Sequence, residues 1–157
     1  DPTPPVEGRM VLRDWTDGNP RLVLRSLEGG AVRVLQSPAG QPGPPVRTAD
    51  WLVWPVGDAA ASLWAVPGPH PSEPGFQLTD RTGPHLTPQV AGDWLVWLDA
   101  GTAPPTLRAL DLRTGFNQPI TSAAIKPTDF AAEAGEVVFI APVDGQSTLF
   151  RQRLDAQ

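Results

Sequence analysis

A repeat of about 42 residues constrains this chain more than any other feature. Residues 49–54 read ADWLVW, and residues 92–97 read GDWLVW, 43 positions later. The same slot holds GEVVF at 135–139, a further 43 positions on, and GRMVL at 8–12, 41 positions before the second copy. This period indicates four copies of one small supersecondary unit.

Each copy is predicted to contain short β-strands. An apolar residue precedes the repeated run, and two further apolar runs follow it, although the fourth copy ends before its third run. All are rich in Val, Leu, Trp or Phe and bounded by Gly, Pro or Asp, as is typical of strands. The pairs before the repeated run favour two-residue hairpin turns: Gly8-Arg9, Ala49-Asp50, Gly92-Asp93 and Gly135-Glu136.

The unit is therefore a four-stranded antiparallel meander, which has the size and strand order of a β-propeller blade. We predict an all-β chain of four such blade-like meanders, a β-propeller or partial propeller, in one domain over 1–157. The blades are expected at about 5–44, 45–88, 89–128 and 129–157, and the last lacks its outer strand.

Composition supports strands over helices. Proline (20) and glycine (15) are scattered through the 157 residues, so long helices are mostly excluded. The formal charge of −5, without any run of basic residues, makes nucleic acid a poor candidate partner. Cysteine is absent, which excludes disulfides and thiolate sites. The first residue is Asp rather than Met, so we expect either a processed mature protein or a trimmed chain. No apolar stretch is long enough to span a bilayer, so no membrane span is expected.

Two copies carry a family resemblance. The third reads VAGDWLVWLDAGTAPPTLRALDLRTGFNQPIT, and the first reads GRMVLRDWTDGNPRLVLRSLEGG. They resemble the repeats of TolB-like β-propellers and related exported propellers, in which a second strand ends in Asp-Leu-x-x-Gly before a Leu-Thr strand. The resemblance implies a periplasmic, cell-envelope or secreted protein. Such blades occur in scaffolds, binding proteins and the non-catalytic domains of peptidases.

The repeated tryptophans Trp51, Trp54, Trp94 and Trp97 are predicted to be core residues. Strand alternation places them on both faces of their strands, and both faces of a blade pack against neighbouring blades. The competing interpretation is a row of sugar-stacking platforms. That interpretation also needs a polar partner recurring in the same register, and none recurs.

Two sets of residues could bind metal, and both are predicted to have other roles. An Asp recurs in the loop between the second and third strands of each copy, where Asp and Gly favour turns more than a calcium site. These residues are Asp17, Asp58, Asp99 and Asp144. His70 and His85, with Glu73 and Asp80, could suggest zinc, but an intervening strand places the two histidines at opposite ends of a blade. We therefore expect neither a metal nor any other cofactor.

The predicted binding residues lie in loops at one end of the blades. Trp15 stands outside the repeated tryptophan register, and an aromatic residue among mixed charges is typical of a protein contact, although a ring at this position could equally pack over the edge of its blade. The predicted set is Trp15, Asp17, Asn19, Arg81 and His85. A rival site is the edge that the missing outer strand leaves on the fourth blade, where another chain could add a strand.

These observations favour a non-enzymatic binding or assembly module, because neither a G-x-S-x-G turn nor a phosphate-binding glycine loop is present. The expected partner is a protein, with a second copy of the same chain as one candidate. Two alternatives remain open at this point. One is a glycan-binding propeller, and the other is a non-catalytic propeller piece of a hydrolase.

Overall fold

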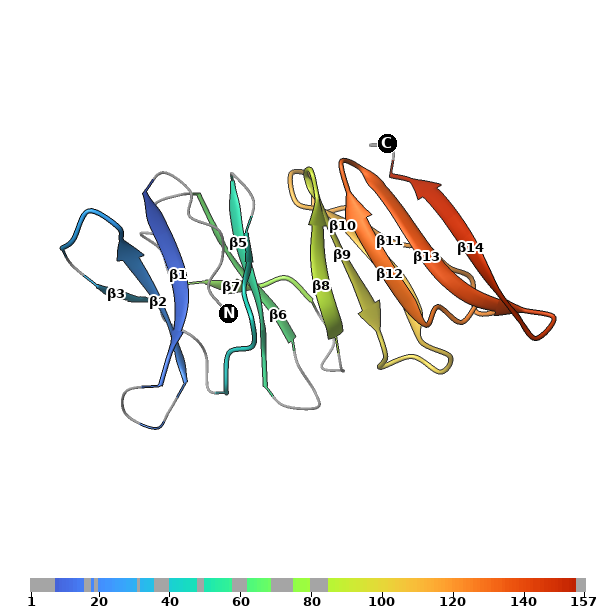
Figure 1. Ribbon diagram of the computed structural model, residues 1–157, viewed down its shortest axis with the longest axis horizontal. Helices are drawn as coiled ribbons and strands as arrows, with labels where there is room; N and C mark the ends of the chain where they lie inside the picture. Colours follow the sequence, from blue (N-terminus) through green and yellow to red (C-terminus); the bar gives the residue numbers. More distant parts are fainter. Residues whose placement is uncertain are drawn as a thin grey trace. The chain divides into compact units, whose positions relative to one another are not determined.

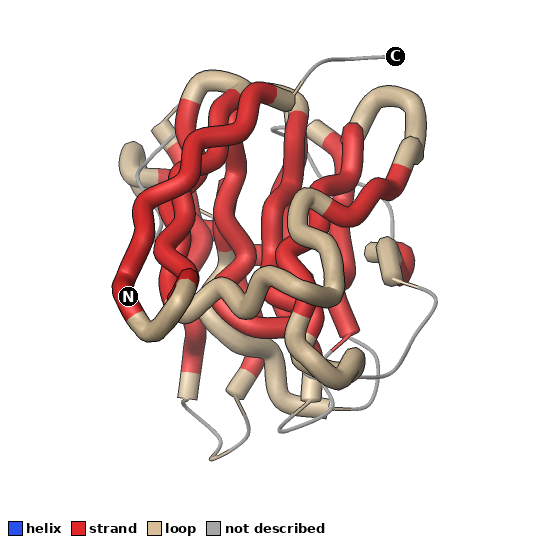
Figure 2. The backbone as a smooth tube through the Cα atoms, turned by 90° about the vertical axis from the view of Figure 1, so that its right-hand side faces the viewer, coloured by secondary structure: helices blue, strands red, loops and turns tan. Residues whose placement is uncertain are grey.

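A computed structural model describes residues 8–15, 18, 20–30, 32–35, 40–47, 50–57, 62–68, 75–79 and 85–154. This part of the chain consists of strands and loops, without a helix (Figure 2). It therefore contains no helix of the length and hydrophobicity needed to cross a bilayer. The chain divides into two compact units, residues 1–82 and 83–157, and each is described by itself.

The first unit holds two antiparallel sheets (Figure 1). The first sheet has the order β1 (Arg9–Asp14), β2 (Arg21–Ser26) and β3 (Arg33–Leu35). The second has the order β4 (Val46–Arg47), β5 (Trp51–Val56), β6 (Ser62–Pro67) and β7 (Phe76–Gln77). The strand predicted around Val6 lies outside the described residues.

The second unit also holds two antiparallel sheets. The third sheet runs β8 (His85–Ala91), β9 (Trp94–Asp99), β10 (Thr106–Asp111) and β11 (Asn117–Pro119). The last sheet runs β12 (Asp129–Glu133), β13 (Glu136–Val143) and β14 (Gln146–Arg153). The prediction of four antiparallel blade-like sheets is confirmed, and among the described residues no strand pairs with the outer edge of β14.

One backbone hydrogen bond recurs in all four sheets and fixes their equivalence. The N–H just after one strand donates to the carbonyl oxygen just before its partner strand, at 2.6–2.9 Å. It joins Leu27 to Gly8, Gly68 to Asp50, Leu112 to Asp93 and Leu154 to Gly135. The accepting residues are 42, 43 and 42 positions apart. The sequence repeat aligns positions 8, 49, 92 and 135, whereas the structure aligns positions 8, 50, 93 and 135. Relative to the two middle copies, the first and last copies are therefore shifted by one residue.

The offset arises because two predicted turns are wrong by one residue. Arg9 and Glu136 were expected in turns, but they are the first residues of β1 and β13. The turn before β13 is Ala134-Gly135, with φ angles of 49° and 77°. A tight turn with positive φ at both central residues matches the twist of a hairpin, and Gly135 adopts that conformation without strain. Glu136 consequently pairs with Glu133 in the ladder.

Side chains alternate between the two faces of each sheet, which are called face A and face B. Face B carries Val11 and Leu22 in the first sheet, together with the residues in register with them in the other sheets. Face A is the opposite side and carries Leu52 and Trp54 in the second sheet. In the first unit, face B of the first sheet packs against face A of the second. The core there comprises Val11, Leu22, Leu24, Leu35, Leu52, Trp54, Val56 and Val66.

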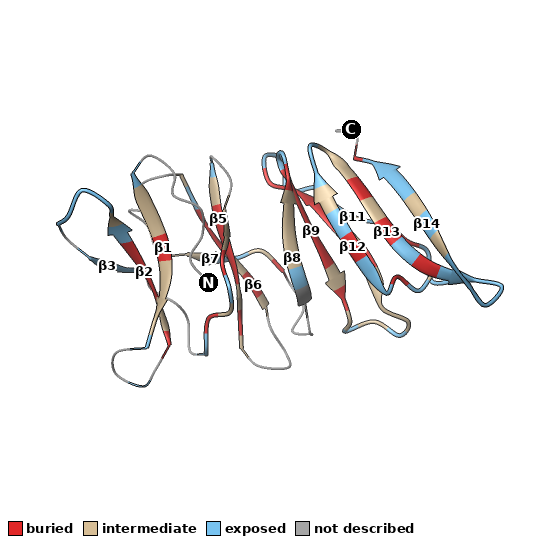
Figure 3. Ribbon diagram, viewed as in Figure 1, coloured by how far each residue is buried: buried red, intermediate tan, exposed pale blue. Residues whose placement is uncertain are grey.

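The second unit repeats this arrangement. Face B of the third sheet contributes Trp94, Val96, Leu107 and Ala109 to its core. Face A of the last sheet contributes Phe130, Val137, Phe139 and Ala141, and the rings of Phe139 and Phe150 stack at 5.0 Å. Figure 3 shows the resulting alternation of buried and exposed residues along β13. In both units, face B of one sheet is covered by face A of the next.

Candidate functional site

The loop after β1 presents an exposed aromatic side chain. Trp15 is 53% exposed, and the guanidinium carbon of Arg13 lies 4.8 Å from its ring centroid. The N–H of Gly18 donates to the carbonyl oxygen of Trp15 at 3.0 Å, which closes the loop into a turn. A cation over an indole face is attractive, so the ring is held in place while it remains accessible.

The other predicted binding residues are only partly addressed by the structure. Asp17, Asn19 and Arg81 lie outside the described residues, and for His85 only the backbone is described, as the first residue of β8. Arg13, the residue that does contact Trp15, was missed. Its spacing from Trp15, two positions along an extended strand, places both side chains on one side and could have revealed the pair.

Two of the recurring loop aspartates have turn roles. Asp99 is buried, and its Oδ1 accepts a hydrogen bond from the Gly101 N–H at 3.1 Å. Asp144 and Gly145 have φ angles of 51° and 78° and form the β13–β14 turn. Asp17 and Asp58, like His70, Glu73 and Asp80, lie outside the described residues. Within the described part, no three His, Asp or Glu residues are grouped closely enough to hold a metal ion.

Asp111 is the first residue of the Asp-Leu-x-x-Gly loop, and its carboxylate, like that of Asp99, accepts hydrogen bonds from backbone N–H groups. Its Oδ1 accepts hydrogen bonds from the N–H groups of Arg113, at 2.8 Å, and Thr114, at 3.3 Å. Burial raises the pKa of the Asp111 carboxyl, but the hydrogen bonds from the Arg113 backbone and from the Thr114 side chain and backbone, together with the charge of Arg113, outweigh it and hold the pKa below its ordinary value. The carboxylate is thus a structural acceptor that orders the β10–β11 hairpin.

The structure places three of the four repeated tryptophans in the core. Trp54, Trp94 and Trp97 are at most 5% exposed, as predicted. The prediction is wrong for Trp51, which is half-buried because it packs edge-on against Phe76, itself exposed, with ring centroids 5.8 Å apart. A row of sugar-stacking platforms would need exposed rings, so these side chains do not provide one.

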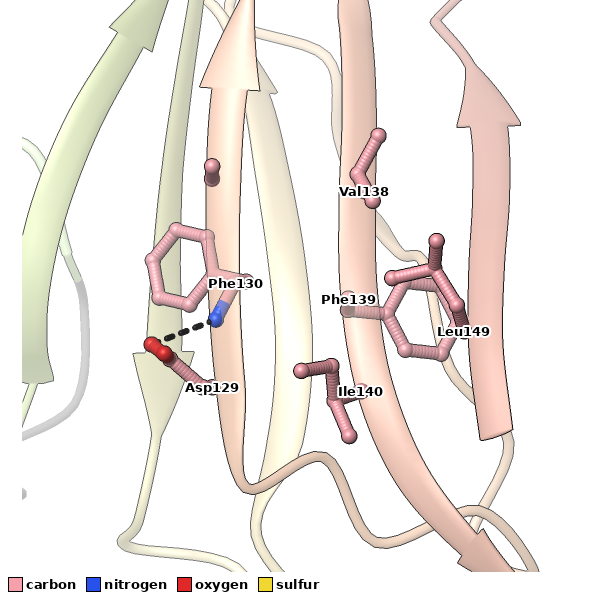
Figure 4. Close-up of a pocket in the computed structure, with 7 residues that line it drawn as sticks. Asp129, Phe130, Val138, Phe139, Ile140 and Leu149 are labelled. Carbon is pink, nitrogen blue, oxygen red and sulfur yellow. Dashed lines mark hydrogen bonds between the residues drawn. The ribbon is translucent and has the colours of Figure 1, made fainter. Parts of the chain in front are cut away.

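Face B of the last sheet is a second candidate surface, which the sequence analysis missed. Ala131, Val138, Ile140 and Leu149 form an apolar patch along it, defined here as the β13 patch. The patch borders a shallow pocket of about 140 Å³ on the same sheet (Figure 4). In Figure 4, Val138, Ile140 and Leu149 project from neighbouring strands toward the viewer.

Equivalent positions in the other sheets show how unusual this exposure is. Leu22, Leu107 and Leu149 occupy equivalent positions in the first, third and last sheets. Their partners in the ladders are Arg13, Leu98 and Ile140, respectively. Leu22 and Leu107 are completely buried, whereas Leu149 is 68% exposed. The difference follows from packing within each unit: among the described residues of 83–157, no further sheet follows the last one to cover its face B.

Charged side chains border the β13 patch at one end. Arg151 lies beside Val138 in the ladder and forms a 2.6 Å ion pair with Glu136. Hydrogen bonding to Glu136 raises the pKa of the Arg151 guanidinium above its ordinary value. Arg151 occupies the position of the completely buried Ala109 in the third sheet. The last sheet therefore combines an apolar patch with a polar border, as protein-binding surfaces do.

Comparison with solved structures adds the fold context. TolB from Acinetobacter baumannii matches 98% of this chain and 40% of its own, with 13% identity and a TM-score of 0.67. The N-terminal domain of Nup159 matches 98% of this chain and 44% of its own, with 14% identity and a TM-score of 0.63. The fold is that of a partial β-propeller. The four sheets are its blades, and the chain spans less than half the length of either of these two proteins.

Two further comparisons bear on this fold. The computationally designed Ika4 protein matches 98% of this chain and 89% of its own, with 11% identity and a TM-score of 0.65. Nup159 also matches in a Saccharomyces cerevisiae complex in which Dbp5 is bound to it, with 14% identity over 98% of this chain and 43% of its own, and a TM-score of 0.64. No protein-family model and no curated protein matches the sequence.

Proposed function

We propose that this chain is a non-enzymatic protein-interaction module built from β-propeller blades. The observation that carries the proposal is the exposed Trp15 ring, which Arg13 holds on the loop between β1 and β2. Large, rigid aromatic side chains contribute strongly to protein interfaces because they bury much area at little entropic cost. The complex of Nup159 with Dbp5 supports protein binding as a role for this fold.

The binding surface is proposed to comprise Trp15, Asp17, Asn19, Arg81 and His85. In the antiparallel first sheet, the β1–β2 loop that carries Trp15 lies at the same end as the end of β3, from which the chain continues to the second sheet. In the second sheet, β7 ends at the same end as β5, and Arg81 and His85 follow β7 in the sequence. Loops on a rigid scaffold are where recognition residues concentrate. The proposed setting is the periplasm, the cell envelope or the extracellular space, and the likeness to TolB supports it.

Replacing Trp15 with alanine is expected to abolish capture of a specific protein partner without lowering the melting temperature. The ring is exposed, so its loss removes binding area rather than core packing. Immobilised wild-type protein and the Trp15→Ala variant would be incubated with the same cell-envelope extract, and quantitative mass spectrometry would compare the captured proteins. Circular dichroism would record the melting temperatures.

The Phe116→Ala variant is a matched control, because Phe116 is also an exposed aromatic residue but lies on the β10–β11 hairpin. It should retain the partner. Equal capture by wild type, Trp15→Ala and Arg81→Ala would contradict the proposed surface. If proline substitutions within Gln146–Arg153 alone abolished capture, the edge of β14 would be the binding site instead.

A further inference from the structure

We infer that face B of the last sheet binds face A of the first sheet of a second copy of this chain. The inference rests on the proposed function, because it names one protein partner of the module. It concerns the β13 patch rather than the Trp15 loop. The two surfaces can therefore be tested separately.

The packing rule within each unit identifies what face B of the last sheet lacks. Face B of the first sheet is covered by face A of the second, and face B of the third is covered by face A of the last. The covered faces contain Val11 and Val96, both at most 1% exposed. Their equivalent Val138 is half-buried, and the neighbouring Ile140 and Leu149 are exposed. The missing component is thus another sheet that presents face A.

The first sheet of another copy offers such a face. Its face A carries Met10, Leu12 and Val23, with Val34 at the outer strand. Val34 at the outer strand is 45% exposed, and Met10 and Leu12 are half-buried. Val23 between them is 4% exposed, so the accessible part of this face lies at the other three residues. This is the same face that the second and last sheets use to cover their neighbours. Pairing it with face B of the last sheet repeats between two copies the contact that exists within each unit.

The charges on the two faces favour this pairing. Face B of the last sheet carries three acids against two arginines: Asp129, Glu133, Glu136, Arg151 and Arg153. Face A of the first sheet carries two arginines against one acid: Arg21, Arg25 and Asp14. The net charges are opposite in sign, so they favour a contact between the two different faces over a contact between two copies of the same face.

The contact joins two different surfaces, so it is heterologous. Each copy carries one surface of each kind. A variant altered on face B therefore still offers an intact face A, and the reverse holds for a variant altered on face A. This property distinguishes the proposed contact from a symmetric one, in which both copies use the β13 patch.

Sedimentation equilibrium over a range of concentrations tests the inference. Wild-type protein is expected to associate beyond its chain mass of 16.8 kDa. Leu149→Arg should weaken self-association by at least about tenfold, because it places a cation in the apolar patch. The Phe116→Arg control introduces the same charge at an exposed aromatic residue elsewhere and should associate like wild type. Unchanged melting temperatures would show that each variant is folded.

A second measurement uses the heterologous character of the contact. Val34→Asp, on face A, should also weaken self-association, because it places an anion opposite the net negative face B. An equimolar mixture with Leu149→Arg should regain it through one intact contact. A wild-type protein that stays monomeric at millimolar concentration would overturn the inference. So would association that Val34→Asp leaves unchanged. Either result would leave partner capture through Trp15 untouched, so failure here is distinguishable from failure of the proposed function.

Discussion

Replacing Trp54 with alanine is expected to lower the free energy of unfolding by about 3–5 kcal/mol. Trp54 is 1% exposed and lies in the core between the first two sheets, with Val11, Leu22 and Leu52. The indole is the largest side chain type that a core can lose, and the surrounding β-sheet backbone can collapse only partly into the cavity. Chemical denaturation followed by circular dichroism measures the change.

Trp51→Ala is the matched comparison, because it removes the same side chain from the same strand. Trp51 is half-buried and contacts Phe76 edge-on, so its loss should cost clearly less than the loss of Trp54. Trp54→Phe should also cost less than Trp54→Ala, since it keeps an aromatic ring in the core. Equal destabilisation by Trp51→Ala and Trp54→Ala would contradict the assignment of Trp54 to the core.

Replacing Ala109 with arginine is expected to unfold the second unit. Ala109 is completely buried on face B of the third sheet, where the last sheet covers it. An arginine there would bury an unpaired charge and overfill a packed core, at a cost of several kcal/mol. Loss of strand signal in circular dichroism, or loss of the dispersed amide resonances of residues 83–157, would report the unfolding.

The reciprocal variant is Arg151→Ala, at the equivalent position of the last sheet. Its side chain is 70% exposed and pairs with Glu136 on the surface, so its loss should leave the unfolding transition almost unchanged. An Ala109→Arg variant as stable as Arg151→Ala would contradict the register equivalence of the two sheets. It would also contradict the covering of face B in the third sheet.

The sequence predicted the strands because local patterns determine them. The apolar runs and the glycine-containing turns each act within a few residues, and the period of about 42 residues shows the same local pattern four times. The one-residue offset before β13 could not be predicted. Both Ala134-Gly135 and Gly135-Glu136 contain a glycine, and only the ladder from Glu133 to Glu136 decides between them.

The candidate site was less predictable, because exposure depends on neighbouring sheets rather than on the strand itself. The loop position of Trp15 could be predicted because it interrupts the repeat. That position fitted an exposed contact residue and a ring packed over the blade edge equally well, and the structure shows the ring 53% exposed. Leu149, by contrast, lies in the same sequence pattern as the buried Leu22 and Leu107. Only the presence or absence of a covering sheet separates them, and the sequence pattern of β14 does not encode that.

Thiol accessibility at these equivalent leucines tests the central claim most directly. The chain contains no cysteine, so Leu22→Cys, Leu107→Cys and Leu149→Cys each carry a single reporter thiol. In dilute solution, the thiol at position 149 should react with a thiol reagent nearly as fast as in the denatured chain. The thiols at positions 22 and 107 should react only as fast as the covering sheets open. Equal protection at all three positions, or rapid reaction at positions 22 and 107, would contradict a fold in which face B of the first and third sheets is covered by the next sheet of its own unit while face B of the last sheet is exposed.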